Sequence, residues 1–272
     1  MLDVAQQGAW VLAMVAVGLA AGFVSGLLGV AGIVVVPVLD MVFGLMAVPS
    51  PLRLKAAIAT SLAIVASTSW AATKAHAARG SVDRPMLVTW TLPLLLGVAC
   101  GTGMASIAEG RVLSALFAAC ALLVAANMMF RADAAPLAPA FPNGISRTAA
   151  GILVGLVSAM MGLGGAAVAV PVLTAFGMDI KRAIGTSAAI GIVIAFPSTL
   201  GYMIAGWGVS GLPPFSVGFV NIAAAAIVVP VSMLTTSLGV RVAHAIPPRQ
   251  LTIGFGAFLI LTACRMGWNS LA

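Results

Sequence analysis

Apolar residues fill this chain in stretches of about 20, and the short segments between them carry nearly all of its charges. Helices of about that length cross the hydrocarbon core of a bilayer, which is about 30 Å thick. No stretch shows the roughly ten-residue alternation of apolar and polar positions that a membrane β-barrel strand requires. The pattern therefore predicts an all-α, polytopic bundle of transmembrane helices.

Two apolar stretches are too long for a single crossing. The first runs from 8 to 48, and as one helix it would be roughly 60 Å long at about 1.5 Å per residue. Its glycine-rich segment at 29–32 is where we expect the helix to break. By the same reasoning, the stretch 149–178 breaks at 162–165. Each break is followed by a short helix, so each half of the chain contains a discontinuous pair.

The short helices carry Pro37 and Pro171 in their first turns, where proline is tolerated. With the helices on either side of each break, we predict ten spans in all, five in each half. The remaining predicted spans are 56–73, 86–107, 112–130, 183–204, 215–238 and 251–267. The alternative is eight spans, with the glycine segments as re-entrant loops.

The two halves repeat each other. The segments 55–61 and 181–187 match at five of seven positions, and an odd number of spans in each copy turns the second copy upside down in the membrane. We therefore predict inverted repeats: an N-terminal transmembrane repeat at 1–130, a proline-rich connecting loop at 131–147, and a C-terminal transmembrane repeat at 148–272.

Composition agrees with a multi-pass protein of a cell membrane, for which the bacterial inner membrane is the expected location. Hydrophobic residues make up 62% of the chain and charged residues 7%, whereas soluble domains are about 25% charged. The net charge of +7 does not indicate a nucleic-acid partner, because the basic residues are scattered among the connections between spans.

The distribution of basic residues predicts the orientation. With ten spans, one side collects nine of them: Lys74, Arg79, Arg84, Arg131, Arg147, Lys181, Arg182, Arg241 and Arg249. The other side has four: Arg53, Lys55, Arg111 and Arg265. Basic residues favour the cytoplasmic side, so both termini are expected outside the cytoplasm. Eight spans would give a seven-to-six split with no preferred orientation.

Motifs for cofactor or metal chemistry are missing from the sequence. Its three cysteines have no CxxC or Cys/His spacing, so we expect small packing residues rather than disulfides or metal ligands. No nucleotide-binding P-loop, H-E-x-x-H or G-x-S-x-G pattern occurs. We expect no cofactor and no enzymatic activity.

The doubled motif resembles the signature of the TauE/SafE (TSUP) family of sulfite and organosulfonate exporters. In the second half it comprises Gly162–Gly165, Val170–Leu173 and Ala183–Ser187. In the first half it comprises Gly29–Gly32, Val36–Leu39 and Ala57–Ser61, with one residue fewer before the proline and Ala31 in place of a glycine. The resemblance implies the transport of small sulfur-containing anions such as sulfite, sulfoacetate or related sulfonates, mostly outward and driven by the proton gradient.

A helix that begins inside the membrane presents unpaired N–H groups and the positive end of its dipole, which together bind an oxyanion without a buried cation. Glycine lets the anion approach the backbone, and nearby hydroxyls can donate to it. The predicted substrate-binding residues are Gly29, Gly32, Thr60, Ser61, Gly162, Gly164, Gly165, Thr186 and Ser187. The alternative is structural: glycines that allow tight helix crossings and hydroxyls that bond back to their own helices.

Three charged residues are further candidates. Lys55 and Lys181 fall on opposite faces of the membrane, where they could attract anions or simply extend to the interface at helix ends. Asp40 is the only acidic residue inside a predicted span, so we predict that it carries the coupling proton, unless it caps its short helix. The second half has Thr174 near the corresponding position.

These observations predict a secondary transporter of small sulfur-containing anions, working with protons in a lipid bilayer. A passive anion channel is one alternative. A membrane-embedded enzyme is another, although it would need paired carboxylates or a histidine cluster within the membrane. The pattern leaves open whether the protein forms a homo-oligomer.

Overall fold

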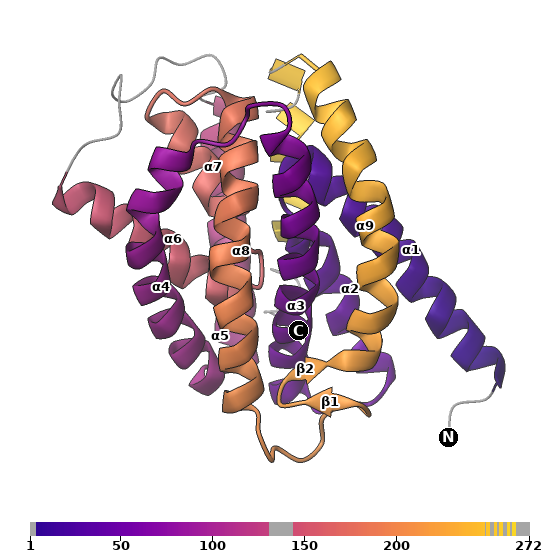
Figure 1. The fold of residues 1–272 in the computed structure, drawn as a ribbon. Helices are drawn as coiled ribbons and strands as arrows, with labels where there is room; N and C mark the ends of the chain where they lie inside the picture. The colour runs from indigo at the N-terminus through magenta and orange to yellow at the C-terminus, as the bar shows by residue number, and fades with distance from the viewer. Residues whose placement is uncertain are drawn as a thin grey trace.

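The computed structural model describes residues 4–130 and 144–247 and part of 249–264. In this part of the chain, helices pack into one bundle, and a short hairpin lies at one end (Figure 1). The elements are α1 (Val4–Leu28), α2 (Gly32–Leu45), α3 (Ser50–Ala77), α4 (Arg84–Ile107), α5 (Gly110–Phe130), α6 (Ile145–Met161), α7 (Ala166–Ala175), α8 (Ile180–Ala205), β1 (Ser216–Val217), β2 (Val220–Asn221) and α9 (Ile222–Ala245).

Five of the described helices are long and apolar enough to cross a membrane, within α1, α3, α4, α8 and α9. Both predicted helix breaks are confirmed. The helix α1 ends at Leu28 and α2 begins at Gly32, while α6 ends at Met161 and α7 begins at Ala166. The glycines thus end one helix and allow the next to start in a new direction.

The structure corrects two boundaries. The span predicted at 215–238 does not begin at 215, because residues 216–221 form the antiparallel hairpin β1–β2 and α9 starts at Ile222. The connecting loop predicted to end at 147 gives way to α6 at Ile145. Most of the span predicted at 251–267, and 131–143 of the connecting loop, lie outside the described residues.

The packing role predicted for the cysteines is wrong for two of them. Cys100 and Cys264 are exposed on the outside of the helices, and Cys120 is half-buried. A membrane protein can present a small thiol to its apolar surroundings at little cost, since free cysteine behaves as a small hydrophobic residue. All three are free thiols.

Two long helices, α3 and α8, lie side by side in the centre of the bundle and run in opposite directions (Figure 1). Gly185, near the start of α8, contacts Ser81, just beyond the end of α3. Gly191, further along α8, contacts Ser69, nearer the middle of α3. The pair α1–α9 packs on one flank and the pair α4–α6 on the other.

Glycines set the distance between the helices of each flanking pair. A Cβ at Gly22 or Gly26 of α1 would collide with the carbonyl oxygen of Ser232 or Thr236 of α9. On the other flank, a Cβ at Gly97 or Gly101 of α4 would collide with a carbonyl oxygen of α6. These are four-residue spacings of small residues, the pattern by which membrane helices approach backbone to backbone.

We predict that Gly101→Ala destabilises the protein by about 1–3 kcal/mol, because the new methyl group would overlap the carbonyl oxygen of Leu156. Gly103→Ala is the matched control on the same helix, since nothing lies within 4 Å of the added Cβ. It should be neutral or slightly stabilising, because alanine favours helix. Thermal unfolding of the purified protein in detergent measures both, and equal effects would contradict the proposed crossing.

Candidate functional site

The two helix breaks meet in the middle of the bundle. Gly29 and Gly162 both have left-handed backbone conformations, with φ of +77° and +71°, so glycine is favoured at these turns. Gly32, at the start of α2, packs directly against the carbonyl group of Gly162. A Cβ at Gly29 would lie 3.0 Å from the Cβ of Ala166, at the start of α7. Each short helix therefore begins against the break in the other half.

The starts of α2 and α7 leave backbone donors unused. Neither helix has a side-chain cap, and the first N–H groups with a helical acceptor are those of Val34 and Val168. The N–H groups that precede them belong to Gly32, Ile33, Ala166 and Ala167, and within the described residues none has a hydrogen-bond acceptor. All four residues are buried.

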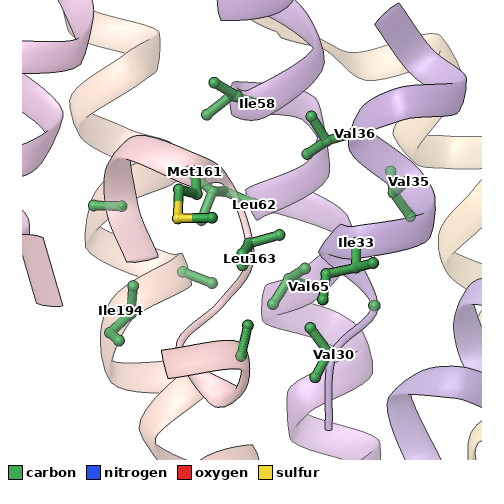
Figure 2. Close-up of a cluster of buried hydrophobic side chains, with 14 of the residues drawn as sticks. Val30, Ile33, Val35, Val36, Ile58, Leu62, Val65, Met161, Leu163 and Ile194 are labelled. Atoms are coloured by element: carbon green, nitrogen blue, oxygen red, sulfur yellow. The ribbon is translucent and has the colours of Figure 1, made fainter. Parts of the chain in front are cut away.

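Apolar side chains enclose the breaks in this conformation (Figure 2). Val36 and Ile58 contact Gly162, Val65 stands against Gly164, and Ile194 stands against Gly165. The surrounding cluster also contains Val30, Ile33, Val35, Leu62, Met161 and Leu163. An anion could reach the unused N–H groups only after these side chains and their helices move apart.

Gly164 and Gly165 continue the left-handed turn, with φ of +68° and +96°. Pro37 and Pro171 each occupy the sixth position of their short helix, in its second turn, and are buried. Because proline has no N–H, the carbonyl group four residues earlier loses its usual helical partner. Both short helices therefore have weakened hydrogen bonding at matching positions.

The two serines of the repeated motif lie at matching positions but differ in bonding. Ser61 of α3 donates a 2.9 Å hydrogen bond to the carbonyl oxygen of Gly162, at the break in the other half. Ser187 of α8 is fully buried, and its hydroxyl has no partner among the described residues. One turn before it, Ile184 contacts Gly29, so Ser187 lies close to the first break.

The two threonines of the motif connect the halves. The hydroxyl oxygen of Thr60 accepts a 2.9 Å hydrogen bond from the backbone N–H of Asn221, and that of Thr186 accepts one of 2.9 Å from the N–H of Asp83. Asn221 and Asp83 are the N-cap residues of α9 and α4. Bonding back to their own helices, the structural alternative, is not seen for these threonines. Their role toward an anion stays a prediction.

Both predicted anion-attracting lysines bind helix C-termini. Lys55 donates a 2.7 Å hydrogen bond to the carbonyl oxygen of Ser106, at the end of α4. Lys181 donates a 2.9 Å hydrogen bond to the carbonyl oxygen of His244, at the end of α9. A lysine there pairs with an unused carbonyl and with the negative end of the helix dipole. The two lysines lie at opposite ends of the bundle, since they are in the first turns of the antiparallel helices α3 and α8.

Asp40 forms an ion pair with Arg53, whose Nε lies 2.9 Å from the carboxylate oxygen Oδ1. Asp40 is in the third turn of α2, so it does not cap that helix. The pair borders a pocket of ≈ 740 Å³ between the starts of α3 and α5. Sequence reasoning found the carboxylate and missed its partner, because no local pattern brings Arg53 back across the α2–α3 turn.

A second pocket, of ≈ 570 Å³, opens where α8 begins. Asp83 and Arg182 form an ion pair there, at 3.0 Å, and Arg147 and Asp179 also line the pocket. Because α3 and α8 run antiparallel, the two pockets open at opposite ends of the bundle. The apolar contacts around the breaks separate them.

The structure also brings together two histidines that sequence reasoning left apart. The ring nitrogens Nδ1 of His76 and Nε2 of His244 are 3.3 Å apart, and Nε2 of His76 lies 3.2 Å from the carbonyl oxygen of Gly26. At the corresponding place in the other half, Tyr202 donates to the carbonyl oxygen of Ala159 at 3.3 Å. The equal spacing of His76 and Tyr202 from Lys55 and Lys181 is the signal that could have indicated this match.

Comparison with known proteins gave a family and two relatives. The family model described as "Sulfite exporter TauE/SafE" matches residues 14–266. A "Probable membrane transporter protein" of Haemophilus influenzae is 29% identical over 259 residues, covering 94% of this chain and 98% of the relative. Another protein so described, from Methanocaldococcus jannaschii, is 23% identical over 251 residues, covering 90% and 91%. The search of solved structures gave no significant match.

We predict that Thr60→Val destabilises the protein by about 1–2 kcal/mol, because the N–H of Asn221 would lose its acceptor in a buried place. Thr186→Val should cost a similar amount, and Thr60→Ser should restore most of the loss. Thr89→Val is the control, since that exposed hydroxyl only donates to its own helix. Thermal unfolding measures the series, and a neutral Thr60→Val would refute the role assigned to this contact.

Proposed function

This chain belongs to the TauE/SafE sulfite exporter family, and from that premise we propose that it is a secondary transporter of small sulfur-containing anions. The substrates we propose are sulfite, sulfoacetate or related organosulfonates, moved outward across the bacterial inner membrane and coupled to protons. Relatives described as membrane transporters support the class of function.

The observation that carries this proposal is the set of four buried N–H groups without acceptors at the starts of α2 and α7. An unpaired buried donor is costly, and an oxyanion held between two helix N-termini would satisfy several at once. Sulfite and sulfonates present three oxygens on one tetrahedral or pyramidal centre, which suits donors converging from two helices. The buried hydroxyl of Ser187 would supply one more donor.

We propose further that the halves are inverted repeats with ten spans. The antiparallel central pair α3–α8 supports this. The contact that Thr60 makes matches that of Thr186, and the contact that Lys55 makes matches that of Lys181. The charges support the orientation. The described basic residues at one end are Lys74, Arg79, Arg84, Arg147, Lys181, Arg182, Arg241 and Arg249, and at the other only Arg53, Lys55 and Arg111.

The two pockets and the closed centre support a mechanism of alternating access. Each pocket opens at one end, and neither reaches the unused N–H groups while the apolar cluster is packed. Rocking of one group of helices against the other would open the breaks to one pocket at a time. Asp40, the candidate proton carrier, lies at one of these entrances.

The test is flux of sulfite and sulfoacetate into proteoliposomes with an imposed pH gradient. We expect transport that follows the gradient and loses that dependence in Asp40→Asn. Flux that ignores the gradient in the wild type would favour a passive anion channel, and no flux of either anion would overturn the substrate assignment.

We predict that Ser187→Ala raises the anion concentration for half-maximal transport roughly tenfold, because one hydrogen bond to a charged group is lost. Protein stability should be unchanged or higher, since the removed hydroxyl has no partner among the described residues. Ser198→Ala is the matched control: it is also on α8, fully buried and unpartnered in the described chain. Equal effects of both variants on transport would exclude a specific role for Ser187.

A further inference from the structure

The two halves make matching contacts, and one place where they differ is Asp40. Pro37 and Pro171 are each the sixth residue of their short helix, so Asp40 and Thr174 occupy the same later position. Arg53 lies two residues before Lys55, and Asp179 lies two residues before Lys181. The ion pair of the first half therefore corresponds to a threonine and an aspartate in the second.

The second half uses these positions for local structure. Thr174 donates to carbonyl oxygens of its own helix, those of Val170 and Pro171, at 3.0 and 3.1 Å. The Asp179 carboxylate accepts the N–H groups of Lys181 and Arg182 as the N-cap of α8. The Asp40–Arg53 ion pair therefore has no counterpart at the corresponding positions of the second half.

The geometry leaves the arginine accessible and the aspartate shielded. The Arg53 side chain is 34% exposed and that of Asp40 is 7% exposed, and both residues line the pocket. Arg53 contacts Asp40 through Nε, and a guanidinium group carries five N–H donors in a planar fork. The pocket of ≈ 740 Å³ has room for a small oxyanion beside it.

We propose that Arg53 is an anion-binding residue of this pocket, and that the Asp40 carboxylate and a small sulfonate or hydrogen sulfite anion compete for its guanidinium group. The inference rests on the proposed function and adds a site distinct from the helix breaks. Asp40 acts as an internal competitor, which keeps the anion weakly held at this entrance and lets it leave.

The exchange balances in charge. The anion replaces the carboxylate as the partner of Arg53, no covalent bond of the anion changes, and the displaced carboxylate is neutralised by taking up one proton. Leaving it charged and shielded would be costly. The proton is returned to the same side when the anion leaves, so this step alone moves no proton across the membrane.

Other charged groups line the pocket as well. Lys55 binds the end of α4 through Ser106, while Glu109 and Arg111 are exposed at the start of α5. Glu109 offers a matched control, because Glu109→Gln removes an acid from the same pocket without touching the ion pair.

The test is calorimetric binding of methanesulfonate to the purified full-length protein, together with exchange of the same anion in proteoliposomes. Asp40→Asn should bind roughly tenfold more tightly than the wild type. Arg53→Gln should bind roughly tenfold more weakly, and the double variant should resemble Arg53→Gln. Arg53→Lys should recover part of the binding, and Glu109→Gln should behave as the wild type.

Two results would overturn the inference. If Asp40→Asn weakens binding or leaves it unchanged while the wild type still transports sulfonate, Asp40 does not compete for Arg53, and the proposed function stands. If the wild type transports neither sulfite nor any sulfonate, the proposed function fails and the inference falls with it. Thermal unfolding of each variant identifies any variant that has lost its fold. If Asp40→Asn is one of these, Asp40→Glu replaces it. Anion binding by Asp40→Glu should equal that of the wild type, and loss of binding would contradict the inference.

Discussion

The structure depends on one constraint: a helix that begins inside an apolar bundle must leave backbone donors without helical partners. The chain accepts that cost twice, at α2 and α7, and it places the two helix starts against each other's breaks. The residues and helices around the two helix starts stabilise this arrangement. Left-handed glycines turn the chain, the long helices α3 and α8 pass alongside, and apolar side chains keep water away from the free N–H groups.

The groups of helices that pack most closely do not coincide with the N-terminal and C-terminal halves of the sequence. The start of α9 is bound to α3 through Thr60, and α9 packs along α1 by glycine contacts. The start of α4 is bound to α8 through Thr186 and Asp83, and α4 packs along α6 in the same way. The strongest packing therefore joins helices from both halves, in the pairs α1–α9, α4–α6 and α3–α8.

Most of the fold could be predicted from local sequence, because glycine and proline change the backbone at their own positions. The breaks at Gly29–Gly32 and Gly162–Gly165 follow from backbone sterics, and helix length follows from bilayer thickness. The hairpin before α9 was missed because its residues are apolar enough to resemble part of a span; Gly218, with φ of +56°, and the N-cap Asn221 were the local clues.

The site was harder to predict, since its polar contacts join residues far apart in sequence. Repetition drew attention to Thr60 and Thr186, but a hydroxyl can donate or accept, and only the packed structure shows that they accept. Lys55 and Lys181 raised the same difficulty. The threonine contacts carry one more implication: each pairs a central helix with the other half's helix start, so both would form equally well between two separate copies of one half inserted in opposite orientations.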